Sequence, residues 1–459
     1  MRNHCLRFIV ALFAAFCMLS CGVTNSVRQR NDISPNQFGL KGARTGVERY
    51  EVLLKTHQAA VAKGVDVDYS GIKRIELEIP KGAKAIPLTQ KNDFKGCTIC
   101  VRNTENNGWL FTATAKSADI NVTGKAIDEG DFHSYSQLRR GKCLLIIEDE
   151  KPWVENRRGY SYGHQRQDIL LIENGHAKNT VTMPYNNADS NPKCKYIVAN
   201  SHPIEVKNLI IKRDAASTAI TRICGISGYD DVRITNFTVN TSESELSGDR
   251  VLSITNSTNV TFTDVRINGT YSQKGKYGYG FSLNNVWNFK AKRLYGNGNW
   301  GVFGNNNVNT AFIEDSEINR FDIHCYGRDV TFKNVKFFDL YNQFSSVYGR
   351  VTFEHCEFRN FTPVLIETSY NAYTEFDVDF TDCEFYTTTE KNYLVNTGSL
   401  SGEVNARREL AVKRLPRVKV ENMKVISFET GEEAQEVDVF LNRGKFVQER
   451  QIQNVIKLK

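Results

Sequence analysis

The sequence predicts an all-β chain folded as a right-handed, single-stranded parallel β-helix with an N-terminal helical cap. The first observation behind this prediction is a strand motif, apolar-x-apolar-x-polar-x-x-apolar, that recurs roughly every 20 to 30 residues, the period of a solenoid. The second is its alternation with a period of two and its richness in Val, Phe and Thr, which exclude a helical solenoid. The third is the Asn, Asp and Gly residues between the strands, which are typical of turns.

The chain begins with a segment typical of an export signal. Arg2 and Arg7 precede an apolar run that is too short to span a bilayer, so residues 1–20 are predicted to be a signal peptide. The ending "MLSC" resembles a bacterial lipobox, which would make Cys21 the lipidated first residue of the mature chain; ordinary cleavage is the alternative. A lipid anchor would attach the protein to the bacterial outer membrane, with the periplasmic and the surface side both open.

A helix is predicted ahead of the strands. The segment 46–64 has the strongest helical pattern of the chain and ends at Gly64. A cap of this kind would cover the strand edges that a solenoid otherwise exposes. The predicted organisation is a lipidated linker and cap helix in 21–69, a β-helix in 70–430 with a long, non-repeating loop excursion at 125–200, and a C-terminal cap or tail in 431–459.

The repeats share a polar or charged residue at their centre. In "VTFTDVRI", Asp264 is predicted to lie at the bend between two strands, with the apolar residues pointing inward. Asn and Asp tolerate the left-handed conformation that such a bend needs, so stacked bends would form a ladder of like residues. The central residues are Asn208, Asn236, Asp264, Arg293, Asp315, Asn334, His355, Asp382 and Asn422.

This organisation resembles the right-handed parallel β-helix of the pectin-lyase-like superfamily over about residues 70–430. The resemblance rests on periodicity, and it implies an activity on polysaccharides, since β-helix lyases of this kind act on pectin, alginate and chondroitin. As a basic, exported chain, the protein is similar to lyases of Bacteroides-type bacteria that act on uronic-acid polymers such as chondroitin and hyaluronan. It lacks the arginine-proline runs of pectate lyases, which argues against pectin.

One repeat replaces its outward positions with ionisable residues. In "RFDIHCYGRDV", which spans 320–330, the inward positions fall to Phe321, Ile323 and Cys325. The outward positions then fall to Asp322, His324 and Tyr326. Aromatic and cationic side chains of neighbouring repeats suit stacking on sugar rings and pairing with carboxylate or sulfate. The expected substrate-binding residues are Asp322, Arg320, Lys276, Tyr277, Tyr279, Trp300, Tyr348, Arg350 and Glu367. The alternative is a solvated strand that carries mixed polar residues and a weak surface ion pair.

The expected reaction is β-elimination of a uronic-acid-containing polysaccharide. In this interpretation His324 removes the C5 proton, Arg328 or Arg320 neutralises the carboxylate, and Tyr326 or Tyr348 protonates the leaving oxygen. A glycoside hydrolase is one alternative, with Asp322 and either Glu367 or Asp339 as a carboxylate pair. A non-catalytic, glycan-binding surface lipoprotein is another, because the fold alone does not imply catalysis.

The charge and cysteine content of the chain limit the partners and metal ions that it is expected to bind. The formal net charge of +7 favours an anionic partner, here an acidic polysaccharide, and the export signal argues against nucleic acid. Cys97 and Cys100 lack the second pair that would complete a zinc site, so they are predicted to be buried thiols. No cofactor or metal is predicted, calcium being left open, and the expected state is a monomer.

Overall fold

The computed structural model describes most of the chain beyond the predicted signal. The described residues are 32–105, 108–154, 164–188, 190–199, 202–219, 222–240, 250–268, 279–296, 301–338, 341–344, 347–359, 362–366, 375–388, 393–396, 416–433, 437–441 and 455–458. Cys21 lies outside them. No helix in this part of the chain is long and apolar enough to cross a membrane.

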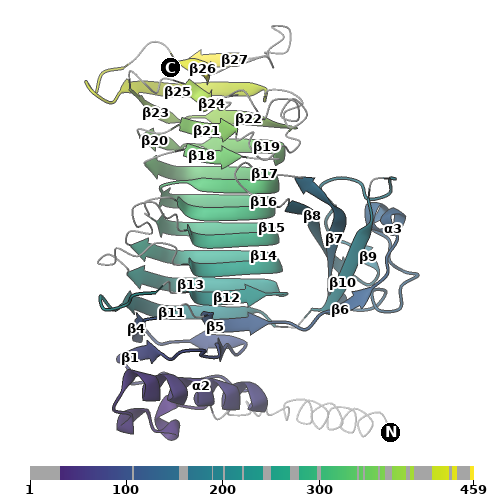
Figure 1. Cartoon of the computed structure of the whole chain (residues 1–459). Helices are drawn as coiled ribbons and strands as arrows, with labels where there is room; N and C mark the ends of the chain where they lie inside the picture. Colours follow the sequence, from purple (N-terminus) through teal and green to yellow (C-terminus); the bar gives the residue numbers. More distant parts are fainter. Residues whose placement is uncertain are drawn as a thin grey trace, which may run out of the picture.

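The main body is a right-handed parallel β-helix, as predicted (Figure 1). Each coil pairs in parallel with the next; Phe281, Phe303 and Phe321 occupy one register position in three successive coils. The first strands of the 22-stranded sheet are β1 (Arg74–Ile79), β2 (Ile86–Pro87), β3 (Lys91–Asp93), β4 (Thr98–Asn103), β5 (Trp109–Thr114), β11 (Ile204–Arg213), β12 (Arg222–Ser227), β13 (Asp230–Asn240), β14 (Arg250–Asn268), β15 (Tyr279–Gly296), β16 (Gly301–Ile318) and β17 (Phe321–Phe338).

The coils after β17 are built from shorter strands. They are β18 (Tyr341–Phe344), β19 (Val347–Glu354), β20 (Glu357–Arg359), β21 (Thr362–Ile366), β22 (Glu375–Thr381), β23 (Glu384–Thr387), β24 (Tyr393–Asn396), β25 (Val418–Ser427), β26 (Asp438–Leu441) and β27 (Val455–Leu458). β26 pairs in parallel with β24, and β27 with β25. The parallel pairing therefore continues beyond residue 430.

Stacked apolar side chains fill the interior of the helix. The ring centroids of Phe281 and Phe303 lie 5.0 Å apart, and those of Phe353 and Phe380 also lie 5.0 Å apart. This spacing matches the distance of about 4.8 Å between neighbouring strands, so each ring rests on its equivalent in the next coil. The cysteines whose side chains the structure describes are all buried and form no disulfide, which confirms the prediction for the "CTIC" pair.

The predicted ladder of central residues is present, and we call it the corner ladder. Its members share a positive φ, from 49° at Asn236 to 56° at Asn208, and follow positions that pair from coil to coil. The Asn236 side-chain amide donates to the Asn208 amide oxygen at 2.8 Å, and Asn422 donates to Asp382 at 3.1 Å. The corner ladder contains Asn208, Asn236, Asp264, Arg293, Asp315, Asn334, His355, Asp382 and Asn422.

The predicted cap helix is also present. α2 (Gly46–Lys63) begins with a capping box between Thr45 and Glu48 and ends at Gly64 in the left-handed conformation. It follows two short 3₁₀ helices, η1 (Pro35–Phe38) and η2 (Leu40–Gly42). Its buried face includes His57, whose two ring nitrogens contact the Pro87 carbonyl at 2.9 Å and the Tyr69 hydroxyl at 2.8 Å.

The excursion from the β-helix is folded, which corrects the expectation of a long loop. A five-stranded antiparallel sheet has the order β6 (Ala118–Ile120), β10 (Pro192–Val198), β7 (Lys142–Val154), β8 (His164–Glu173) and β9 (His176–Ala177), and α3 (Gly124–Glu129) precedes β7. We call this unit the inserted sheet; it stands beside the β-helix in Figure 1. Phe132, Leu145 and Leu170 belong to its own apolar core. The runs "CLLIIE" and "ILLIE" form its central strands and are buried on both faces, one in the unit's own core and the other in a cluster that includes Trp287 of the β-helix.

The buried histidine of the cap predicts a pH-dependent stability. Burial lowers the pKa of His57 to about 4, from an ordinary value of 6.5. Because its pKa is lower in the folded than in the unfolded chain, the folded state binds fewer protons between these values. Stability is therefore complete above about pH 6.5 and falls with pH toward 4, by about 1.4 kcal/mol per pH unit. Thermal unfolding of wild type and His57→Gln should diverge over this window, and parallel curves would contradict the prediction.

The corner ladder predicts a contrast between two substitutions at Asn236. Asn236→Ala forces a left-handed conformation on alanine and should lower the free energy of unfolding by about 1–2 kcal/mol. Asn236→Gly loses the same exposed hydrogen bond but accepts the backbone, so it should cost less. Urea midpoints of both variants measure the difference. Equal losses would mean that the side-chain bond, rather than the backbone, accounts for the preference.

Candidate functional site

The ionisable residues at the start of β17 meet a tyrosine that comes from two coils earlier. Tyr279 is the first residue of β15, and its hydroxyl lies 2.9 Å from Nε2 of His324 in β17. The two rings are 5.3 Å apart at 64°. The structure thus brings together Tyr279 and His324, two of the residues that the sequence assigned to the site.

A glycine in the intervening coil makes this contact feasible. Gly304 in β16 pairs with Asp322, and a Cβ at position 304 would lie 2.5 Å from Cγ of the Tyr279 ring. The ring therefore lies against the backbone of β16, where any side chain would displace it. The sequence pattern gave no indication of a role for Gly304.

His324 occupies a β-bulge. Asn305 pairs with Ile323, whereas the next residue, Asn306, pairs with Cys325, so His324 is an additional residue in its strand. Bulges redirect side chains and are enriched beside active sites. The predicted alternation holds at Phe321 and Ile323, which are in the core, and then fails.

Cys325 follows the bulge directly. Its partner Asn306 is half-buried and itself pairs with the half-buried Asn284. That Cys325 continues the inward series stays a prediction. The side chains of Cys325 and Tyr326 lie outside the described residues.

Asp322 and His324 are buried, which corrects the expectation that they project into solvent. Asp322 and Arg320 are 0% exposed, and His324 is 9% exposed. Nε of Arg320 donates to Oδ1 of Asp322 at 2.8 Å, and a second bond joins Nη2 to Oδ2. Burial disfavours the charged guanidinium, but the adjacent Asp322 carboxylate outweighs it and raises the pKa of Arg320.

The ion pair supports the histidine. Oδ2 of Asp322 lies 3.8 Å from Nε2 of His324, and the guanidinium of Arg320 lies 4.6 Å from the centre of the Tyr341 ring. Arg320 and Asp322 are fully buried, and His324 and Tyr279 are the groups nearer the surface.

The remaining predicted residues are distributed over other segments. Arg328 in β17 and Tyr348 in β19 are register partners of these two parallel strands. Nη1 of Arg328 lies 3.3 Å from the Thr180 hydroxyl of the inserted sheet. Arg350 comes after the next corner and forms an ion pair with Asp379 at 2.8 Å. The residues that lie outside the described part are Lys276, Tyr277, Trp300 and Glu367.

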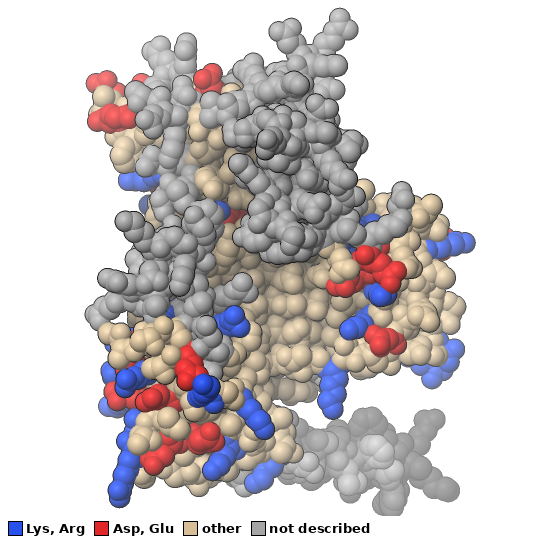
Figure 2. Space-filling model, in the orientation of Figure 1, with Lys and Arg blue, Asp and Glu red and all other residues tan. Residues whose placement is uncertain are grey.

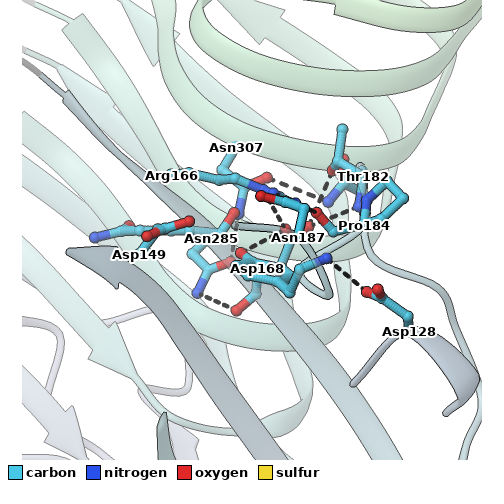
Figure 3. Close-up of polar contacts among 12 residues, drawn as sticks. Asp128, Asp149, Arg166, Asp168, Thr182, Pro184, Asn187, Asn285 and Asn307 are labelled. Carbon is cyan, nitrogen blue, oxygen red and sulfur yellow. Dashed lines mark hydrogen bonds and ion pairs between the residues drawn. The ribbon is translucent and has the colours of Figure 1, made fainter. Parts of the chain in front are cut away.

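The inserted sheet docks at the corner next to the His324 strand. Asn285 and Asn307 have left-handed backbones there, and their side-chain amides donate to the backbone carbonyls of Asp168 and Gln167 in β8 (Figure 3). Asn307 also donates to Asn285, and Asn285 to Asn256. We call Asn256, Asn285 and Asn307 the docking ladder. The docking ladder thereby holds the inserted sheet beside the strand that carries His324.

A buried polar network stabilises the inserted sheet near the docking ladder. Asp168 accepts hydrogen bonds from the Tyr185 hydroxyl at 2.9 Å and from the backbone and hydroxyl of Thr182 at 3.0 Å, and Arg166 lies 3.6 Å away (Figure 3). Burial raises the pKa of the Asp168 carboxyl, although Arg166 opposes the shift. Since Asp168 and Tyr185 are both 1% exposed, the network holds segment 182–185 against β8. Sequence reasoning missed it.

Positive and negative side chains are mixed on the described surface. In Figure 2, Lys and Arg side chains are intermixed with Asp and Glu over the cap and the inserted sheet, and the described surface of the β-helix between them is mostly uncharged.

Among the described residues, one group could hold a metal ion: Asp131, His133 and His176 on the inserted sheet.

Comparison with solved structures supports the fold. The chain is similar to the tailspike gp61 of Pseudomonas phage phi297, with a TM-score of 0.52, 12% identity, and coverage of 90% of this chain and 79% of that one. The tailspike gp49 of Pseudomonas phage LKA1 gives a TM-score of 0.49, 13% identity, and coverage of 86% and 77%. The Gp54 tailspike of Acinetobacter baumannii bacteriophage AP22, solved with a capsular saccharide, gives 0.43, 12%, 86% and 70%.

The similarity at this level of identity establishes the fold alone. The parallel β-helix is the shared feature, and the first of these three structures carries that conclusion. No protein-family model matches the sequence, and no curated protein matches it. The chemistry of the site must therefore be argued from its own residues.

The contact between Tyr279 and Gly304 predicts a measurable coupling. Gly304→Ala should lower the free energy of unfolding by about 1–3 kcal/mol, because the new Cβ overpacks against the ring. In a Tyr279→Ala background the same substitution should cost markedly less. A double-mutant cycle of urea midpoints gives the coupling. Additive losses would show that the ring does not lie against Gly304.

Proposed function

We propose that this protein cleaves an acidic, uronic-acid-containing polysaccharide by β-elimination, at the face built around Tyr279 and His324. The observation that carries the proposal is the 2.9 Å contact between the Tyr279 hydroxyl and Nε2 of His324, with the buried Asp322 carboxylate 3.8 Å from the same nitrogen. Two proton-transfer groups in hydrogen-bond contact can pass a proton between them, which is what general acid-base catalysis needs.

The proposed reaction moves one proton between carbon and oxygen. The C5–H bond and the C4–O4 bond of the uronate break, a C4–C5 double bond forms, and the leaving O4 takes a proton. The Tyr279 oxygen accepts the C5 proton while His324 takes the tyrosine proton. Tyr279 then donates its proton to O4, and His324 returns the proton it took to the Tyr279 oxygen. Asp322 stabilises the imidazolium that forms between these steps. Tyr279 thus takes both the role of acid that the sequence assigned to Tyr326 and the role of base that it assigned to His324.

The carboxylate of the substrate needs a positive neighbour, and Arg328 remains the proposed one. Its side chain is 41% exposed, with Nε 3.3 Å from the exposed Asp329 carboxylate and Nη1 3.3 Å from the Thr180 hydroxyl of the inserted sheet. Arg320 is unsuited to this role because Asp322 neutralises it and it is fully buried. Removing an acidic C–H proton depends on this charge stabilisation as much as on the base.

The hydrolase alternative finds less support in the described residues. Glycoside hydrolysis uses two carboxyl groups, about 5 Å apart in retaining and about 6.5–9.5 Å apart in inverting enzymes. Asp322 is bound to Arg320 and 0% exposed, and its predicted partner Glu367 lies outside the described part. The non-catalytic alternative is a glycan-binding lipoprotein, which would bind the polysaccharide without cleaving it.

Export, anchoring and assembly are proposed from the sequence. Lipidation at Cys21 would hold the enzyme at the outer membrane, close to a polysaccharide too large to diffuse inward. The proposed partner is that acidic polysaccharide, the proposed state is a monomer, and calcium is a proposed option.

The reaction can be tested on a panel of uronic-acid polysaccharides. A lyase yields an unsaturated product with a new ultraviolet absorbance, whereas a hydrolase yields reducing ends without it. On the substrate that wild type cleaves, His324→Ala and Tyr279→Phe should each lower the rate by about 10²- to 10⁴-fold. Tyr279→Phe retains the ring against Gly304 and removes only the hydroxyl.

His355→Ala serves as the control, because that imidazole is an exposed member of the corner ladder. Thermal unfolding of each variant separates loss of chemistry from loss of fold, which matters since His324 is buried. Full activity in both Tyr279→Phe and His324→Ala would place the site elsewhere. Binding without any cleavage across the panel would favour the non-catalytic reading.

A further inference from the structure

A tight hairpin of the inserted sheet carries a histidine in a fixed position. β8 and β9 are joined at Asn174 and Gly175, which have φ values of 49° and 84°. Successive left-handed residues of type Asn-Gly form the tight turns that best match the twist of a hairpin. His176 follows the turn directly, as the first residue of β9.

The segment after α3 runs against this hairpin and adds two further ligands. Asp131 pairs with His176 across an antiparallel bridge, and the Phe132 amide donates to the Gly175 carbonyl at 2.8 Å. Nδ1 of His133 lies 2.9 Å from Oδ1 of Asp131. The backbone of two separate segments therefore brings one carboxylate and two imidazoles to the same place.

The side chains converge closely. One ligand atom from each of Asp131, His133 and His176 lies within 4.8 Å of the others, and the two imidazole rings are 4.3 Å apart at 68°. Gly175 contributes by lacking a side chain, since a Cβ there would lie 3.1 Å from the His133 ring. All three residues are exposed, so an ion could reach them from solvent.

We propose that Asp131, His133 and His176 form a binding site for a divalent transition-metal ion of the Zn²⁺ class. Two imidazoles and one carboxylate are ligands that zinc, nickel, copper and cobalt accept, whereas calcium and magnesium prefer oxygen ligands throughout. Metal–ligand bonds of about 2.0–2.2 Å place ligand atoms roughly 3.3 Å apart in a tetrahedron. Small rotations of the three exposed side chains close the remaining distance.

The site is separate from the proposed catalytic residues. It belongs to the hairpin and helix end of the inserted sheet, whereas Tyr279 and His324 belong to the coils of the β-helix. Three protein ligands leave at least one position of a tetrahedral ion open for water or an external donor. The inference therefore stands or fails independently of the lyase proposal.

The test uses calorimetry to measure the binding of Zn²⁺ to the full chain, without a tag and after treatment with a chelator. Wild type should bind one ion per chain at this site, and His133→Ala, His176→Ala and Asp131→Asn should each weaken binding by about tenfold or more. Co²⁺ should give a visible spectrum in wild type that is lost in His176→Ala.

His355→Ala is the matched control. His355 is an exposed imidazole 3.8 Å from the Asp382 carboxylate, and the structure gives that pair no second imidazole within its described surroundings. Its loss should leave the Zn²⁺ affinity unchanged. The proposal is overturned if wild type binds no more tightly than His176→Ala, or if His355→Ala weakens binding as much. Circular dichroism of each variant confirms that the inserted sheet remains folded.

Discussion

The stacking of equivalent apolar side chains from coil to coil is the constraint on which the rest of the structure depends. The rings of Phe281, Phe303 and Phe321 follow one another at 5.0 and 4.9 Å, which fixes the register of three coils. A shift of one residue would turn every inward side chain outward, so the register is strongly specified. The β-bulge at His324 is tolerated because Phe321 before it and Val330 after it both keep their core positions.

The departures from the repeat are concentrated in a few adjacent coils. Tyr279, Gly304, Asp322 and His324 each break the pattern, and Asn305 brings an amide into the core, where its oxygen accepts the Leu283 amide proton at 3.1 Å. Removing one partner of the Arg320 and Asp322 pair would leave a buried charge, at a cost of about 3–5 kcal/mol. Natural sequences accept such local conflicts mainly at functional sites, which is why this cluster, rather than the regular coils, carries the proposed chemistry.

The sequence predicted the regular part of the molecule and failed where the contacts are non-local. The corner ladder and α2 follow from local patterns, namely a polar residue at a fixed position and an 18-residue helical segment ending at Gly64. The burial of His324 does not, because a strict alternation of faces assumes that no bulge is present. The contact of Tyr279 with His324 depends on how many residues each coil contains and on the missing side chain at Gly304.

The inserted sheet shows how one residue type serves two purposes. Each Asn of the docking ladder turns the chain through its left-handed backbone, and Asn285 and Asn307 also bind β8 through their side-chain amides. Neighbouring coils of the β-helix therefore hold both the inserted sheet, through Asn307, and His324. Trp287 in β15 packs against an apolar cluster of the inserted sheet. Nη1 of Arg328 in β17 contacts the Thr180 hydroxyl of the same unit. The inserted sheet is thus held to the β-helix both by the polar contacts of the docking ladder and by apolar packing at Trp287.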